Sequence, residues 1–310
     1  GEKEIDPSKY YGIQTLRAKE NFNITKTDIS LFPNFIKSLA KVKKACALTN
    51  YELGDLSDMQ KDAIVQACNE IIDGKFHDQF IVDPIQGGAG TSTNMNANEV
   101  IANRALEILG HPKSSYNIIH PNNHINMSQS TNDVYPTAIK LTLHELIYKL
   151  KDALRFLRDC FEEKAIEFKD VLKMGRTQLQ DAVPMTLGQE FKTFAVMIDD
   201  DIYRLRNVQA LLKEINLGAT AIGTGINTKA SYQRKVISNL REVTGVDYVS
   251  AGDLIEATQD TGSFVHISGM LKSVAIKISK ICNDLRLLSS GPRAGFNEIN
   301  LPPLQPGSSI

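Results

Sequence analysis

Apolar residues in the last two-thirds of the chain recur at alternating steps of three and four. Three such series run over residues 139–161, 187–215 and 267–288. This spacing places the apolar side chains along one stripe of a helix and the charged side chains on the opposite face. Each series predicts a helix of about 30 residues, or about 45 Å at 1.5 Å per residue.

Helices of this length indicate a long helical bundle, because an average globular helix has only about a dozen residues. The apolar stripes need more burial than three helices of one chain supply, so self-association through the bundle is expected. An oligomeric helical protein with no catalytic task would show the same periodicity. The pattern therefore predicts the fold and leaves the function open.

Shorter elements are expected before residue 130. Residues 33–53 and 57–73 read as two helices, the second opened by a capping box of Ser57 and Gln60. A third helix is expected over 95–109. No set of alternating residues is large enough for a sheet core, so we expect a mainly all-α protein.

We place a domain boundary where the long helices begin. Residues 1–129 are expected to form a small, mostly helical domain that carries a substrate loop. Residues 130–310 are expected to form the central bundle of long helices.

Charge and cysteine usage restrict the partners and the compartment. Thirty-five basic residues nearly balance 36 acidic ones, and the net charge of −1 gives no reason to expect nucleic acid or a membrane as partner. No apolar run approaches the roughly 18 residues of a membrane span. The four cysteines are scattered without a CxxC pair, which favours a reducing cytoplasm. His120 and His124 have a metal-like spacing but no acidic third ligand, so we expect no metal.

Polar, uncharged residues are concentrated just before three of the expected helices. They occupy the segments 86–96, 128–133 and 175–181, and the chain ends on a further Gly-Ser-Ser segment at 307–309. Helix N-termini offer unpaired N–H groups and a partial positive charge, and hydroxyl and amide groups add neutral donors. Single segments of this kind are usually caps and turns. Together they favour a site for a small carboxylate, and no GxxxxGK[ST] motif supports a phosphate loop.

These segments carry a family resemblance. GTSTNMNANEV at 90–100, STNDVYPT at 130–137, GRTQLQDAVPMTLGQE at 175–190 and GSSI at 307–310 resemble, in order and spacing, the motifs of the aspartase/fumarase superfamily. The resemblance covers essentially all 310 residues. It implies a small N-terminal domain, a central bundle shared by four chains in a homotetramer, and a third domain. The chain stops inside the last motif, so the C-terminal part of this fold is expected to be missing.

The resemblance also implies a reaction, the reversible elimination of ammonia from L-aspartate to give fumarate. Fumarases show a histidine where this chain has Gln178. Hydroxide is a poor leaving group that needs a proton donor, whereas the protonated amino group of aspartate can leave as ammonia. Fumarate hydratase, acting on L-malate, is the nearest alternative. The sequences of argininosuccinate and adenylosuccinate lyases do not match these motifs, and a non-catalytic protein of the same fold is a further alternative.

Site residues follow from the resemblance. Ser309 is the implied catalytic base, which removes a proton from the carbon beside one carboxylate and leaves an aci-carboxylate intermediate. The implied substrate donors are Thr91, Ser130, Thr131, Asn132, Thr177 and Gln178. No cofactor is implied, and the expected partner is a small dicarboxylate. More weakly, His120, Asn122 and Asn123 fall where some members bind anions at a second site, and Arg176 and Asp181 are expected to hold their loop in place.

Overall fold

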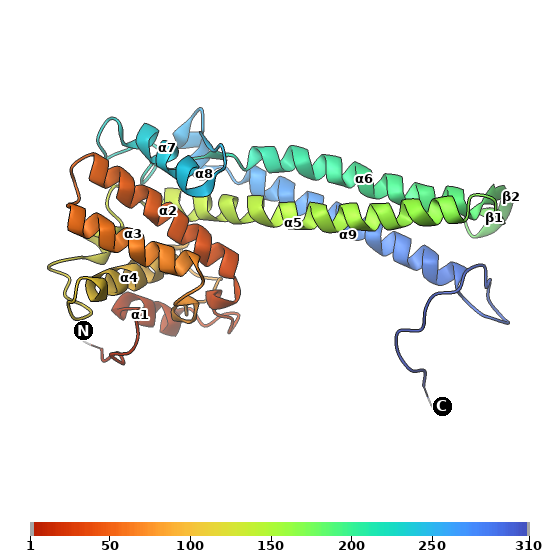
Figure 1. The fold of residues 1–310 in the computed structure, drawn as a ribbon, viewed down its shortest axis with the longest axis horizontal. Coiled ribbons are helices and arrows are strands. Elements are labelled where there is room, and N and C mark those ends of the chain that lie inside the picture. The colour runs from red at the N-terminus through yellow and green to blue at the C-terminus, as the bar shows by residue number, and fades with distance from the viewer. Residues whose placement is uncertain (1–2, 309–310) are drawn as a thin grey trace. The chain divides into compact units, whose positions relative to one another are not determined.

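Helices dominate the structure, a computed structural model that describes residues 3–308 (Figure 1). The helices are α1 (Ile13–Asn21), α2 (Pro33–Glu52), α3 (Asp58–Ile72), α4 (Thr91–Ile108), α5 (Thr131–Glu167), α6 (Leu187–Leu211), α7 (Tyr232–Thr244), α8 (Leu254–Gln259) and α9 (Gly262–Leu288). Short helical turns cover Ile29–Leu31, His77–Gln79 and Pro121–Ile125. The all-α prediction is confirmed. None of the described helices combines the length and the apolar character needed to cross a membrane.

Contacts divide the chain into two compact units. The first comprises Gly1–Glu145 and Ala210–Thr261, and the second comprises Leu146–Gln209 and Gly262–Ile310. These units do not test the predicted division into domains 1–129 and 130–310, which stays a prediction.

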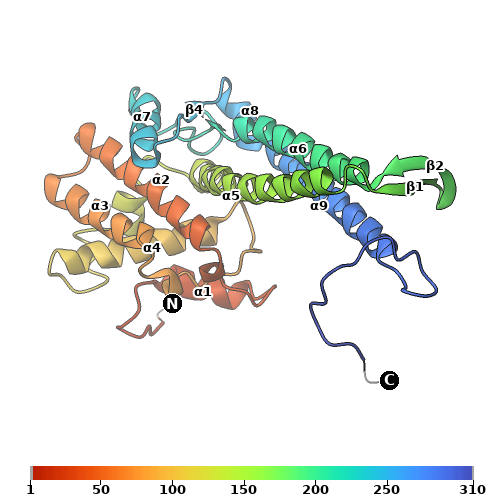
Figure 2. The ribbon, with the colours of Figure 1, turned by 45° about the vertical axis from the view of Figure 1, so that its right-hand side comes forward.

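Helix α2 is the central element of the first unit, and it is buried on two faces. On one face Ile36 and Ala40 join a cluster of apolar side chains from α3 and α4. On the other, Leu39 and Val42 join a second cluster built by the start of α5, by α7 and by the segment around Ile215. Helices α2, α3 and α4 lie side by side in both views (Figure 2). The capping box of Ser57 and Gln60 predicted for α3 is present.

A carboxylate from α4 holds α1, a helix that the apolar pattern did not predict. The buried side chain of Glu99 accepts hydrogen bonds from the backbone N–H groups of Gly12 (2.8 Å), Gln14 (2.9 Å) and Thr15 (3.0 Å), and from the Thr15 hydroxyl (2.6 Å). Helix α1 has no cap of its own and no acidic residue in its first turn. Glu99 therefore supplies the acceptors and the negative charge that a helix N-terminus needs.

The long helices α5, α6 and α9 run alongside one another in the second unit (Figure 2). Phe161 of α5 packs against Phe191 and Phe194 of α6, with ring centroids 6.2 and 5.6 Å apart. The predicted series 139–161 and 267–288 lie wholly inside helices. The series 187–215 is too long, because α6 ends at Leu211 and Ile215 belongs to a strand.

Two small sheets complete the structure. Strands β1 (Leu172–Thr177) and β2 (Gln180–Thr186) form an antiparallel hairpin, and β3 (Glu214–Ile215) pairs in parallel with β4 (Val249–Ser250). The polar segment 175–181, noted above only as preceding a helix, lies in this hairpin. Gln178 and Leu179 form its two-residue turn with φ of +50° and +61°, the backbone of a type I′ turn. The sequence lacks the Asn-Gly pair that usually marks such a turn, so the pattern gave no signal for it.

Candidate functional site

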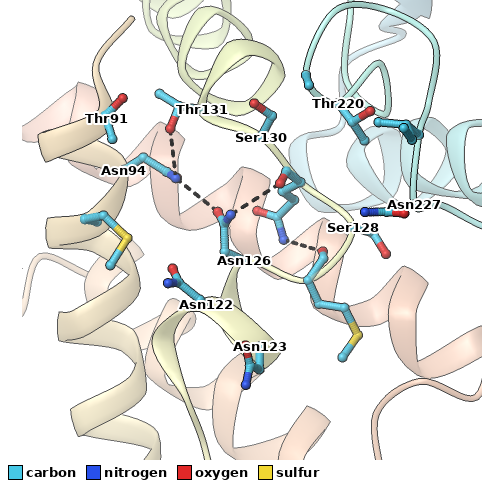
Figure 3. A pocket seen from close by; sticks show the side chains of 15 residues that line it. Thr91, Asn94, Asn122, Asn123, Asn126, Ser128, Ser130, Thr131, Thr220 and Asn227 are labelled. Atoms are coloured by element: carbon cyan, nitrogen blue, oxygen red, sulfur yellow. Dashed lines mark hydrogen bonds between the residues drawn. The ribbon is translucent and has the colours of Figure 1, made fainter. Parts of the chain in front are cut away.

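A pocket of about 630 Å³ opens in the first unit, between the first turns of α4 and α5 (Figure 3). Its other walls are the segment from Asn122 to Ser130 and the loop that contains Thr220 and Asn227. Its lining side chains are hydroxyls, amides and a few apolar groups, and none of those described carries a formal charge. Neutral donors at two helix N-termini make this a place for an anionic group.

The N-terminus of α4 depends on a glycine. Gly90 adopts φ +88°, and a Cβ added there would overlap the ring of Tyr135. Gln86 caps the helix from outside, since its Oε1 accepts the N–H of Thr93 (3.0 Å) and its Nε2 donates to the Thr93 hydroxyl (2.9 Å). Thr91 is thereby held in the first turn of the helix, at the rim of the pocket.

The variant Gly90→Ala is expected to lose about 2–3 kcal/mol of stability, from steric overlap with Tyr135 and from the left-handed backbone. Thermal unfolding of the parent and the variant measures this loss. Gly74→Ala is the matched control, because Gly74 has φ +101° but nothing within 4 Å of an added Cβ. Equal losses in the two variants would show that backbone strain alone is responsible and that the contact with Tyr135 contributes nothing.

Helix α5 begins at Thr131, earlier than the polar segment 128–133 suggested. Pro136 therefore lies in the second turn of the helix rather than the first. A proline has no N–H, so the carbonyl of Asn132 lacks its usual partner four residues on. The side-chain amide of Asn216 fills this gap by donating to the Asn132 carbonyl (3.0 Å).

Buried Asp133 joins the start of α5 to the loop after β3. Its carboxylate accepts the N–H groups of Ser130 (3.0 Å), Gly218 (3.0 Å) and Thr220 (3.1 Å). Removal from water raises the pKa of Asp133 to about 6, and the three N–H donors oppose that rise. These hydrogen bonds hold Thr220, a β-branched residue with φ +58°, against the pocket, and the Asn132 amide adds a hydrogen bond to the carbonyl of Ala221 (2.7 Å).

A network of amides forms the floor of the pocket (Figure 3). Asn94 Nδ2 donates to Asn126 Oδ1 (3.0 Å) and to Thr131 Oγ1 (3.3 Å). Asn126 Nδ2 donates in turn to the carbonyl of Gln129 (3.3 Å). The ammonium group of Lys43 lies behind this network and donates to Asn126 Oδ1 and Gln129 Oε1, both at 2.9 Å.

The residues implied as substrate donors fall in two places. Thr91, Ser130 and Thr131 line the pocket, and Asn132 adjoins it through its backbone N–H, which donates to the Ser130 hydroxyl (3.2 Å). Thr177 and Gln178 are exposed on the β1–β2 hairpin of the second unit. Ser309, the implied base, lies outside the described residues.

A second pocket of about 420 Å³ includes Gln178 and lies within the second unit. Arg176 forms a two-pronged ion pair with Glu298 (2.6 and 3.1 Å) and lies 3.9 Å from Asp181. Arg176 thus anchors the hairpin to the segment after α9.

The two histidines support their own turn. His120 Nδ1 accepts the N–H groups of Asn122 (3.0 Å) and Asn123 (3.3 Å), and His124 Nδ1 accepts the N–H of His120 (2.8 Å). Asn122 and Asn123 line the first pocket, whereas His120 does not. No group of three His, Cys, Asp or Glu residues within 3–308 is placed to hold a metal ion.

Several residues in the pocket or directly behind it escaped the sequence interpretation. They are Lys43, Asn94, Asn126 and Thr220. Asn94 and Asn126 stand inside or beside polar segments that were noticed, but their spacing does not reveal that they meet. Lys43 lies in an apolar helix pattern, and a lysine at one of the apolar positions of that pattern was the one available signal.

Known proteins share both a family model and much of their sequence with this chain. The family model described as Lyase matches residues 1–310. The chain is 60% identical over its full length to an aspartate ammonia-lyase of Helicobacter pylori and covers 66% of that protein. It is 55% identical to the aspartate ammonia-lyase of Escherichia coli K12 and covers 65% of it. The chain thus spans slightly less than two thirds of the length of these relatives.

Solved structures agree with the fold. A fumarate lyase (delta crystallin) from Brucella melitensis superposes with a TM-score of 0.98 at 55% identity, covering all of this chain and 67% of that one. A class II fumarase from Schistosoma mansoni gives a TM-score of 0.93 at 35% identity, covering 99% of this chain and 67% of the other. With the family model matched from end to end and relatives more than half identical, this chain belongs to the lyase family of the aspartase/fumarase superfamily.

Proposed function

We propose that the protein is an aspartate ammonia-lyase, which eliminates ammonia from L-aspartate to give fumarate. The observation that carries this proposal is the pocket between two helix N-termini, where the hydroxyl groups of Thr91, Ser130 and Thr131 meet without a charged side chain in the lining. Such neutral donors suit a carboxylate whose charge grows during the reaction. The 55–60% identity to proteins named aspartate ammonia-lyase supports the same substrate.

The difficult step is removal of a proton from the carbon beside the β-carboxylate, since it places a second negative charge on that carboxylate. We propose Ser309 as the base, with its hydroxyl ionised for the step. The electron pair of the intermediate then forms the carbon–carbon double bond of fumarate as the C–N bond breaks, and the protonated amino group leaves as ammonia while the abstracted proton stays on the base. Ser130, Thr131 and Asn132, with Thr91, Thr177 and Gln178, are proposed to bind the carboxylates more strongly in the intermediate than in the substrate.

The proposed enzyme works as a homotetramer in the cytoplasm and requires no cofactor. Large apolar side chains remain exposed on the long helices of the second unit, among them Phe156 (73%), Tyr203 (63%) and Val265 (67%). Exposed apolar residues on long helices support association with further copies of the bundle. The four cysteines are unpaired, which supports a reducing compartment.

The substrate assignment is tested with the complete gene product. L-Aspartate and L-malate are supplied separately, and fumarate is followed by its ultraviolet absorbance. Fumarate and ammonia from aspartate alone are expected. Fumarate from malate alone would make the protein a fumarate hydratase, with Gln178 wrongly interpreted, and inactivity on both would favour a non-catalytic role.

The variant Thr131→Val is expected to lower kcat/KM for L-aspartate about 10–100-fold, because it removes one hydroxyl donor and keeps the shape of the side chain. Steady-state kinetics measures the change. Thr142→Val is the control, since Thr142 lies on the same helix, donates its hydroxyl to the carbonyl of Ala138 (2.7 Å) and lines neither pocket. Unchanged kinetics in Thr131→Val would remove this residue from the proposed site.

A further inference from the structure

A buried lysine behind the pocket has no part in the proposed chemistry. Lys43, on α2, is 1% exposed, and its ammonium group reaches Asn126 Oδ1 and Gln129 Oε1 at 2.9 Å each. Asn126 and Gln129 line the pocket, but Lys43 itself does not. Within the described residues, no carboxylate forms an ion pair with Lys43. Buried lysines without such a partner are rare, because desolvation of the charge is unfavourable.

The lysine determines which way the amides face. An ammonium group only donates hydrogen bonds, so Asn126 and Gln129 must turn their oxygens toward it. Asn126 Oδ1 then also accepts from Asn94, which requires Asn94 to present its NH₂ group. The opposite oxygen, Asn94 Oδ1, is left buried without a partner among the described residues. The amides keep this orientation although the buried oxygen Asn94 Oδ1 is left without a hydrogen-bond donor among the described residues.

The same orientation reaches a proposed substrate residue. The NH₂ group of Asn94 also donates to Thr131 Oγ1 (3.3 Å). An oxygen that accepts from Asn94 must direct its own proton elsewhere, and Thr131 lines the pocket. The chain of hydrogen bonds from Lys43 through Asn126 and Asn94 thus turns the Thr131 hydroxyl into a donor for a bound ligand. Figure 3 shows the Asn126–Asn94–Thr131 part of this chain.

Charge points in the same direction. The described side chains that line the pocket are neutral. The Lys43 ammonium lies directly behind two of them, Asn126 and Gln129, and donates to both. Loss of hydration lowers the pKa of Lys43 to about 8, with nearby Cys46, Asp133 and Cys68 acting in the opposite sense. The lysine is therefore still charged at neutral pH, in spite of its burial. Coulomb attraction is strong in such a poorly solvated place.

We propose that Lys43 is a positioning residue of the dicarboxylate site, which orients the Asn126–Asn94–Thr131 relay and places a positive charge behind the bound carboxylate. Lys43 does not touch the substrate and takes no part in proton transfer. This inference rests on the proposed function, because it assigns the ligand of the pocket as a dicarboxylate. It adds a residue to the site that the motifs do not contain.

The test uses the complete protein and three variants. Lys43→Met removes both the charge and the donors, and Lys43→Gln retains one amide donor without the charge. Lys44→Met is the matched control, since Lys44 is the next residue on α2 and donates to Asn69 Oδ1 (2.8 Å) at the surface, away from the pocket lining. Succinate binding by calorimetry and aspartate kinetics are measured for each protein, together with thermal unfolding.

Both Lys43 variants are expected to bind succinate about 10–100-fold more weakly and to raise KM for aspartate, with Tm unchanged or higher. Lys44→Met should match the parent. Parental binding and kinetics in Lys43→Met would overturn the inference. Loss of folded protein in both Lys43 variants would also overturn it, because the lysine would then be structural. A parent that binds succinate but does not act on aspartate would instead contradict only the proposed function.

A pH profile separates charge from shape. Succinate has no group that titrates near pH 8, so any change in its affinity there comes from the protein. The affinity of the parent for succinate should fall as pH rises through about 8, because Lys43 then loses its proton and its charge. Burial raises the pKa of Cys46 and Cys68 to about 12, and the pKa of Asp133 is about 6, so none of these neighbours titrates there. Lys43→Met should lack this fall. An unchanged fall in Lys43→Met would assign it to another group.

Discussion

Replacing Ser309 with alanine in the complete protein is expected to lower kcat for L-aspartate about 10²–10⁴-fold, the contribution typical of a general base. The reason is chemical, since the proton beside the β-carboxylate is only weakly acidic and the Ser309 hydroxyl is the proposed base that removes it. Aspartate kinetics measures the loss, and succinate affinity should change little because binding does not require the base.

Ser308→Ala is the control for this experiment, because it makes the same change one residue earlier. Near-parental kcat in Ser308→Ala combined with a large loss in Ser309→Ala would support the assignment. A Ser309→Ala variant that retains full kcat would show that another group removes the proton.

The second large effect concerns stability. Glu99→Ala is expected to reduce the free energy of unfolding by about 3–5 kcal/mol, because it leaves the buried N–H groups of Gly12 and Thr15 and the partly buried N–H of Gln14 without their acceptor. Denaturant unfolding measures the difference. Glu163→Ala, an exposed position on α5, is the control and should stay within about 0.5 kcal/mol of the parent. A similar small change in Glu99→Ala would mean that water replaces the lost acceptors.

Periodicity predicted the long helices well because burial along one face determines them. The apolar residues in 139–161 and 267–288 form continuous stripes, and each stripe lies inside one helix. Where local backbone geometry decides instead, the pattern failed. The hairpin turn at Gln178 and Leu179 uses left-handed residues that are neither glycine nor asparagine, and α1 depends on a carboxylate more than 80 residues away.

The sequence predicted the part of the candidate site that lies in local segments, the polar residues just before helices. Polar segments before helices mark the N-termini of α4 and α5, and Thr91, Ser130 and Thr131 do line one pocket. Contacts between residues far apart in the chain leave no local sequence pattern, so they could not be predicted. Lys43 reaches Asn126 across 83 residues, and the N–H of Thr220 in the pocket wall donates to Asp133, 87 residues earlier.

The bond from Asn216 to the Asn132 carbonyl makes the start of α5 depend on a residue 84 positions later in the chain. Asp133 likewise waits for its partners Gly218 and Thr220. At about 5–20 residues per second, a ribosome delivers those partners about 4–17 seconds after Asn132. During that interval the nascent chain carries a proline in the second turn of the helix, and the Asp133 carboxylate lacks two of the three N–H partners that it has in the folded structure. The binding pocket is thus completed late in synthesis, and a chain truncated before residue 216 lacks the means to finish it.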